Sequence, residues 1–249
     1  MSASLVFLSG WAHSAEVFRP LLEKLGGVKS SLLVSPSQLL VACQSDKRRE
    51  ERKDIGLYAQ SLLALIESLP PPRIFIGWSM GGMIGLEALS GSNIAEKLIL
   101  LSSACRFTSD KDYPYGSSLG ALRLMKQRFL REDKPALRDF FSLVSYPGLL
   151  TEEETEFMVM NATREGKESL IGGLEYLENV DLRDKIPGVR VPTLLLHGRC
   201  DKVIPCEASH YLAAKLKDSS LVIIEEAGHD LVSSHLRAVS ECISEFVDS

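Results

Sequence analysis

The chain of 249 residues lacks any apolar run long enough to cross a membrane. Its first residues, 1–4, also lack the basic region and apolar core of a secretory signal, and they lead directly into a short strand pattern. The sequence contains no internal repeat and no low-complexity segment. We therefore expect a globular protein of the cytoplasm that has no membrane partner.

An excess of basic charge is also missing. The chain has 28 Lys and Arg residues against 33 Asp and Glu residues, which gives a formal net charge of −5 at pH 7. A protein that follows nucleic-acid phosphates usually has the opposite imbalance. The composition therefore predicts no nucleic-acid partner.

Cysteine is scarce, and its positions follow no known framework. The five cysteines are odd in number and widely scattered, at Cys43, Cys105, Cys200, Cys206 and Cys242. This spacing suits reduced thiols, because it gives neither a disulfide framework nor the CxxC and Cys/His clusters of a zinc site. We expect no metal and no cofactor.

What the sequence does contain is an alternation of short apolar strands with helical patterns. Strands are expected at 5–8, 31–34, 74–78, 96–101, 193–198 and 221–224. Between about 107 and 185 the alternation gives way to helical segments broken by Pro and Gly. This pattern predicts an α/β fold: a mostly parallel sheet with helices on both faces and one helical insertion. A mixed-charge run at 47–53 is expected to be a solvated helix or loop without a function.

We assign residues 1–105 and 187–249 to the core of this fold. Residues 106–186 form the inserted helical lid in this assignment. One domain with an insertion accounts for the chain length better than two small domains. We expect the protein to be a monomer.

The rest of the chain is organised around a Gly-x-Ser-x-Gly motif at 77–81, which follows an apolar strand and precedes a helical pattern. Small residues at 77 and 81 are needed because a tight strand-to-helix turn leaves no room for a Cβ on either side. Ser79 then lies at the apex with its hydroxyl exposed to a substrate. A chance Gly-x-Ser-x-Gly in a loop is the alternative, and the strand and helix around the motif favour a nucleophile.

A serine nucleophile needs a general base and an acid that orients the base. Asp201 and His229 each follow a strand pattern, so both are expected at the same sheet edge as Ser79. Taken alone, Asp201 is also compatible with a helix cap, and His229 with one structural hydrogen bond. The order Ser79, Asp201, His229 matches that of hydrolases with this motif and favours a triad. The other histidines fit the role of the base less well: His13, His197, His210 and His235.

The loop after the first strand, Ser9–Ser14, supplies a glycine turn between a strand and a helix. Backbone N–H groups in such a turn can face a ligand, and the N-terminus of the helix behind Ser79 offers further unpaired N–H groups. Both are candidate donors to an oxyanion. The alternative for the loop is a plain connecting turn.

These motifs resemble those of the α/β-hydrolase superfamily over nearly the whole chain. More narrowly, Gly77–Gly82 and Gly172–Arg183 are similar to stretches of the pimeloyl-acyl-carrier-protein methyl ester esterases of biotin synthesis. The resemblance implies an α/β-hydrolase fold and removal of a methyl ester from a pimeloyl chain on acyl carrier protein. It also implies the triad Ser79, Asp201 and His229, with the N–H groups of Trp11 and Met80 as the oxyanion hole.

The chain departs from this family pattern in three places. Ser9-Gly10 stands where His-Gly is usual, which leaves the backbone donors in place. The Pro-Gly turn that often follows the third strand is absent around 35–44. The basic residues with which the family holds its carrier protein do not match one by one, so they are not transferred to this chain.

The lid sequence has its own charge and apolar pattern. Between Arg106 and Arg138 eight basic residues stand against four acidic ones, a local excess of +4. Such a contrast suits an acidic carrier protein, for which we propose Arg123, Arg128 and Arg131 as docking residues; a solvated helix face is the alternative. The acyl chain is expected to meet a set of apolar side chains nearby: Phe107, Leu122, Met125, Phe129, Phe140 and Phe141.

The sequence thus predicts a serine esterase. Because fold does not fix reaction, two other enzyme classes stay open: a carbon–carbon lyase or hydrolase of the menaquinone-pathway synthase type, and a general short-chain carboxylesterase. A binding protein that kept the pocket and lost turnover is a further alternative.

Overall fold

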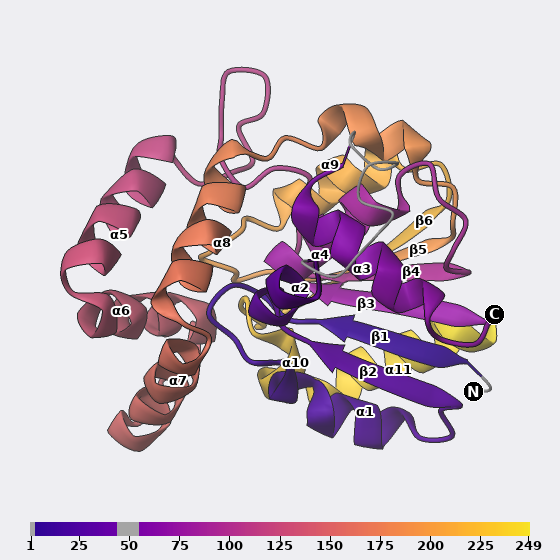
Figure 1. The fold of residues 1–249 in the computed structure, drawn as a ribbon, viewed down its shortest axis with the longest axis horizontal. Coiled ribbons are helices and arrows are strands. Elements are labelled where there is room, and N and C mark those ends of the chain that lie inside the picture. Colours follow the sequence, from indigo (N-terminus) through magenta and orange to yellow (C-terminus); the bar gives the residue numbers. More distant parts are fainter. Residues whose placement is uncertain (1–2, 44–54) are drawn as a thin grey trace.

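The structure, a computed structural model, describes residues 3–43 and 55–249. The mixed-charge run at 47–53 lies outside these ranges. Figure 1 shows a twisted sheet with helices on both faces and, beside it, a separate group of helices.

The sheet has six parallel strands in the order β2-β1-β3-β4-β5-β6. Their bounds are β1 (Ser4–Leu8), β2 (Ser30–Val34), β3 (Arg73–Trp78), β4 (Lys97–Leu101), β5 (Thr193–Gly198) and β6 (Ser219–Ile224). The expected parallel sheet is therefore confirmed, with small differences at strand starts. Since every strand runs the same way, all carboxyl ends lie at one edge of the sheet.

Helices cover both faces because alternate strand residues point to opposite sides. The core helices are α1 (Arg19–Leu25), α2 (Pro36–Cys43), α3 (Leu57–Glu67), α4 (Met80–Leu89), α9 (Glu207–Lys215), α10 (Leu231–Ser234) and α11 (Leu236–Asp248). Val6 and Leu8 belong to one apolar cluster, which includes residues of α3 and α4. Leu5 and Phe7 belong to a second cluster, with residues of α1 and α11. Residues 35–44, where the usual Pro-Gly turn is absent, contain helix α2.

A helical insertion lies between β4 and β5 and forms the group beside the sheet in Figure 1. It consists of α5 (Leu119–Arg131), α6 (Asp133–Ser145), α7 (Glu152–Arg164) and α8 (Lys167–Asn179). Helix α7 starts at a capping box, in which Thr151 and Glu154 bond each other's backbone N–H groups. Helix α8 is joined to α4 of the core, since the Tyr176 hydroxyl donates to Glu87 at 3.2 Å.

Two further features concern the whole of the described chain. Within residues 3–43 and 55–249, no helix combines the length and the apolar character needed to span a bilayer. The cysteine side chains that the structure describes, Cys105, Cys200, Cys206 and Cys242, are free thiols.

Candidate active site

Ser79 lies between the end of β3 and the start of α4, at the sheet edge where all strands end. Its backbone has φ 54° and ψ −121°, a conformation that costs a non-glycine residue energy. The turn has no space for larger residues at the motif glycines. A Cβ on Gly77 would lie 2.6 Å from the Cα of Gly82, and one on Gly81 would lie 2.2 Å from the backbone oxygen of Leu8. The motif therefore forms the strained strand-to-helix turn that the sequence predicts.

A chain of hydrogen bonds joins Ser79, His229 and Asp201. The Nε2 atom of His229 lies 2.9 Å from the Ser79 hydroxyl, and its Nδ1 lies 2.7 Å from Oδ2 of Asp201. Since a carboxylate only accepts, Nδ1 carries the proton and Nε2 is left to accept from the serine. All three residues are buried. The structure thus brings together residues that are up to 150 positions apart in sequence.

The carboxylate of Asp201 is held on both of its oxygens. Its Oδ1 accepts from the backbone N–H groups of Val203 at 2.8 Å and Ile204 at 2.9 Å. Burial alone would raise the pKa of this carboxyl, but the neighbouring His229 and hydrogen bonds from His197 and His229 hold it well below its usual range. The alternative that Asp201 caps a helix is wrong, because the N-cap of α9 is Cys206.

The loop after β1 packs directly against the serine. A Cβ on Gly10 would lie 3.2 Å from the Cβ of Ser79. The indole of Trp11 donates to the backbone oxygen of Leu170 at 2.8 Å, which ties this loop to α8. Met80 is the first residue of α4, so its N–H has no partner within the helix. Both residues of the predicted oxyanion hole therefore lie beside Ser79.

The other histidines occupy different environments. His13 is buried against the ring of Trp78, at 4.4 Å between ring centroids. His210 is exposed on α9 and His235 is half-buried at the start of α11, as packing or solvated residues would be. His197 is the residue that sequence reasoning missed, because its Nε2 lies 3.1 Å from Oδ2 of Asp201. The sequence feature that could have indicated this contact is the position of His197 at a strand end, four residues before Asp201.

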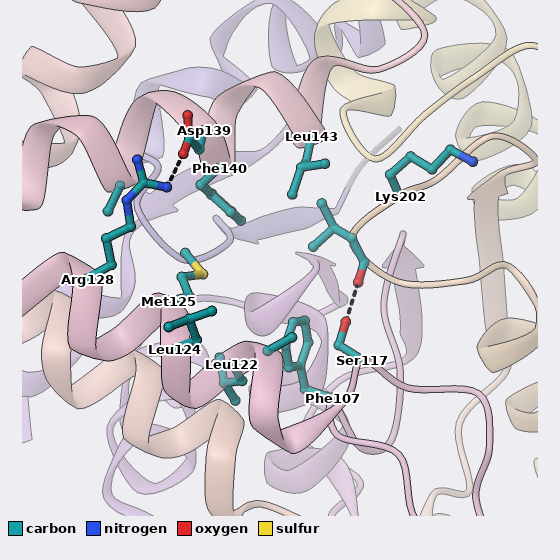
Figure 2. Close-up of a pocket in the computed structure, with 13 residues that line it drawn as sticks. Phe107, Ser117, Leu122, Leu124, Met125, Arg128, Asp139, Phe140, Leu143 and Lys202 are labelled. Atoms are coloured by element: carbon teal, nitrogen blue, oxygen red, sulfur yellow. Dashed lines mark hydrogen bonds and ion pairs between the residues drawn. The ribbon is translucent and has the colours of Figure 1, made fainter.

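An apolar pocket of about 310 Å³ is lined mainly by residues of α5 and α6 (Figure 2). Of the predicted apolar set it is lined by Phe107, Leu122, Met125 and Phe140. The remaining lining residues are Ser117, Ala121, Leu124, Arg128, Ala136, Asp139, Leu143, Lys202 and Val203. The pocket adjoins the site at Phe140, whose ring is 4.8 Å from that of Trp11, and at Val203, which donates to Asp201.

Two residues of the predicted apolar set do not line this pocket. Phe129 is buried with its ring 6.0 Å from that of Trp11. Phe141 is buried with its ring 5.3 Å from that of His13. Both side chains belong to helices of the insertion and pack against the loop after β1.

Charges from other helices offset much of the basic excess on α5. Arg123 pairs with Glu178 of α8 at 2.7 Å. Arg128 pairs with Asp139 of α6, as Figure 2 shows. Arg131 is exposed, and no carboxylate within the described residues forms an ion pair with it. The local net charge of +4 counted from the sequence is therefore larger than the positive charge that the surface of α5 presents. In the ranges that the structure covers, no three His, Cys, Asp or Glu side chains group as a metal site.

Comparisons with known proteins find relatives that match nearly the whole chain. The pimeloyl-(acyl-carrier protein) methyl ester esterase of Xanthomonas axonopodis pv. citri is 27% identical over 99% of this chain and 95% of its own length. The enzyme of the same name from Neisseria meningitidis serogroup A is 28% identical over 97% of this chain and 75% of its own.

Solved structures share the fold. An esterase from Exiguobacterium antarcticum matches with a TM-score of 0.84 at 22% identity, and a hydrolase from Oleispira antarctica matches with 0.86 at 15%. Each match covers 100% of this chain and 92% of the other. The family model described as "Alpha/beta hydrolase family" matches residues 5–242, almost the full length. The chain therefore belongs to the α/β-hydrolase family.

Proposed function

We propose that the protein is a serine carboxylesterase, with Ser79 as nucleophile, His229 as general base and Asp201 as the group that orients the base. The observation that carries the proposal is the unbroken hydrogen-bond chain from the Ser79 hydroxyl through His229 to Asp201, at 2.9 and 2.7 Å. It starts at a serine on strained backbone, where a substrate carbonyl can approach the hydroxyl.

In this mechanism Ser79 Oγ bonds to the ester carbonyl carbon while its proton moves to Nε2 of His229. The N–H groups of Trp11 and Met80 stabilise the oxyanion that forms. The carbon–oxygen bond to the alcohol then breaks, and His229 returns the proton to the departing alkoxide. Water attacks the acyl-enzyme with the same base, which releases the acid and restores Ser79.

For the substrate we propose the methyl ester of pimeloyl-acyl-carrier protein, which would yield pimeloyl-acyl-carrier protein and methanol. The similarity to the Xanthomonas and Neisseria enzymes over most of the chain supports this choice. The apolar pocket beside Phe140 suits an acyl chain. In this proposal residues 106–186 act as a lid on the core, and Arg123, Arg128 and Arg131 receive the acidic carrier.

A comparison of substrates tests the proposal. Hydrolysis of the methyl pimeloyl ester on its carrier protein is measured beside that of short free methyl esters, with Ser79→Ala as the background control. We expect a higher kcat/KM for the carrier-bound ester. Preference for short free esters would make the protein a general short-chain carboxylesterase. Hydrolysis of neither ester would favour a carbon–carbon lyase or a binding protein.

A further inference from the structure

A second histidine, His197, contacts the same carboxylate oxygen of Asp201 as His229 does. It lies near the end of β5, and its side chain is fully buried. Its Nε2 atom is 3.1 Å from Oδ2 of Asp201 and 2.9 Å from the backbone oxygen of Ile204. Both neighbours only accept hydrogen bonds, so Nε2 of His197 must carry a proton and donate it.

The other ring nitrogen of His197 is fixed as well. Its Nδ1 lies 2.6 Å from the hydroxyl of Ser209 on α9. That hydroxyl also lies 3.4 Å from the backbone oxygen of Ser103, and as both donor and acceptor it can pair with Nδ1 in either protonation form. The ring is therefore held at both nitrogens and has no freedom to turn away from Asp201.

The carboxylate of Asp201 then has four donors, two on each oxygen. Val203 and Ile204 donate to Oδ1, while His229 and His197 donate to Oδ2. A carboxylate has about four acceptor sites, so every site is used. Such charge-assisted bonds are strong in a buried environment, where water offers no substitute.

We propose that His197 is a positioning residue, which acts on the reaction by holding Oδ2 of Asp201 in line with Nδ1 of His229. This inference rests on the proposed function of the triad. The two backbone donors fix Oδ1 only, so without His197 the Oδ2 atom is held by His229 alone. Rotation of the carboxylate about its own axis would then move the atom that orients the base.

Two substitutions separate the contact with Asp201 from the contact with Ser209. In His197→Gln the side-chain amide nitrogen reaches the position of Nε2 and keeps a donor to Asp201. In His197→Asn the shorter amide reaches only the position of Nδ1, so it keeps the contact to Ser209 and loses Asp201. Ser209→Ala is the matched control, because it removes the partner of Nδ1 of His197 and leaves the bond from Nε2 to Asp201.

The measurement is the rate at which a fluorophosphonate labels Ser79, followed by mass spectrometry on protein shown to be folded by circular dichroism. His197→Asn should slow labelling about 10- to 100-fold, the range expected when a hydrogen bond to a charged group is lost. His197→Gln and Ser209→Ala should remain within a few-fold of wild type.

The outcomes separate this inference from the proposed function. If wild-type protein is not labelled at Ser79, the serine esterase proposal itself fails. If wild type is labelled and His197→Asn keeps its rate, only the positioning role is overturned. An equal loss in His197→Gln also overturns it, because a donor to Asp201 would then not be what His197 supplies.

Discussion

The indole N–H of Trp78 donates a hydrogen bond to the backbone oxygen of His229 at 3.0 Å. Trp78 is the residue before the serine and is fully buried, with its ring 5.8 Å from that of His229. The strand that positions the nucleophile therefore also positions the loop that carries the base. This bond links the two halves of the site through a side chain that takes no part in the chemistry.

Trp78→Phe should weaken both the fold and the reaction. The buried oxygen of His229 loses its donor, which typically costs about 1 to 3 kcal/mol in the free energy of unfolding. The His229 loop is then less well fixed, so labelling of Ser79 should slow about tenfold. Urea unfolding and fluorophosphonate labelling measure the two effects. Phe18→Leu is the control, since Phe18 belongs to the same apolar cluster. Equal slowing in both variants would contradict a specific link to His229.

Ser79→Ala should abolish ester hydrolysis and leave the fold intact. The hydroxyl contributes little packing at the turn, whereas loss of a triad member typically lowers kcat by about 10⁴ to 10⁶. Initial rates with an activated ester give the loss, and thermal unfolding checks the fold. A variant that retained more than about a tenth of wild-type activity would rule out Ser79 as the nucleophile.

His13 should make the stability of the protein depend on pH. Burial is the main cause that lowers the pKa of His13 to about 4, and the hydrogen bond between its Nδ1 and the Trp11 oxygen only partly opposes it. The unfolded state, with a histidine pKa near 6.5, binds the proton first as the pH falls. The free energy of unfolding is therefore not reduced by His13 above about pH 6.5. As the pH falls from 6.5 toward 4, it decreases by roughly 3 kcal/mol.

Urea unfolding at pH 4.5 and 6.5 tests this dependence. In His13→Asn the amide keeps a donor near the Nδ1 position and cannot titrate, so this variant should lose less stability between the two pH values than wild type. His235→Asn, at a half-buried surface position, is the control and should keep the wild-type loss. The same loss in wild type and His13→Asn would show that His13 is not the titrating group.

Local patterns in the sequence were enough to predict the parallel fold, the turn at Ser79 and the positions of Asp201 and His229. Each depends on a short motif at a strand end, and parallel strands bring such ends to one edge. The contact between His197 and Asp201 was not predictable in this way. From the sequence, a histidine inside an apolar strand is expected to be a packing residue. The contact depends on the conformation of the loop after β5, in which the N–H groups of Val203 and Ile204 hold the carboxylate of Asp201.

The insertion was predicted least well, because helix packing decides which residues face each other. Arg123 and Glu178 are 55 positions apart, so the charge count over one stretch could not include their ion pair. Phe129 shares the apolar stripe of α5 with Leu122 and Met125. Phe129 lies farther along the helix, where its ring contacts Trp11 and does not line the pocket. The composition of the insertion indicated a basic and apolar surface. The contacts between its helices determine how much of that charge stays unpaired and which apolar residues line the pocket.

Reversing Arg123, Arg128 and Arg131 to Glu together should weaken the use of a carrier-bound ester. An acidic carrier is attracted to positive charge on α5, and exposed charges act mainly on association within a Debye length of about 8 Å at physiological salt. We expect KM for the carrier-bound ester to rise on the order of tenfold at low salt and less at high salt. Turnover of a small free ester should stay nearly unchanged.

Single substitutions refine this prediction. Arg131→Glu should account for most of the effect, because Glu178 and Asp139 already offset the charges of Arg123 and Arg128. Arg237→Glu is the matched control, an exposed arginine on α11 of the core. Steady-state kinetics with both esters at two salt concentrations give the comparison. If the triple variant changes both esters equally, or neither, or if Arg237→Glu has the same effect, this face of α5 is a solvated surface without a part in recognition.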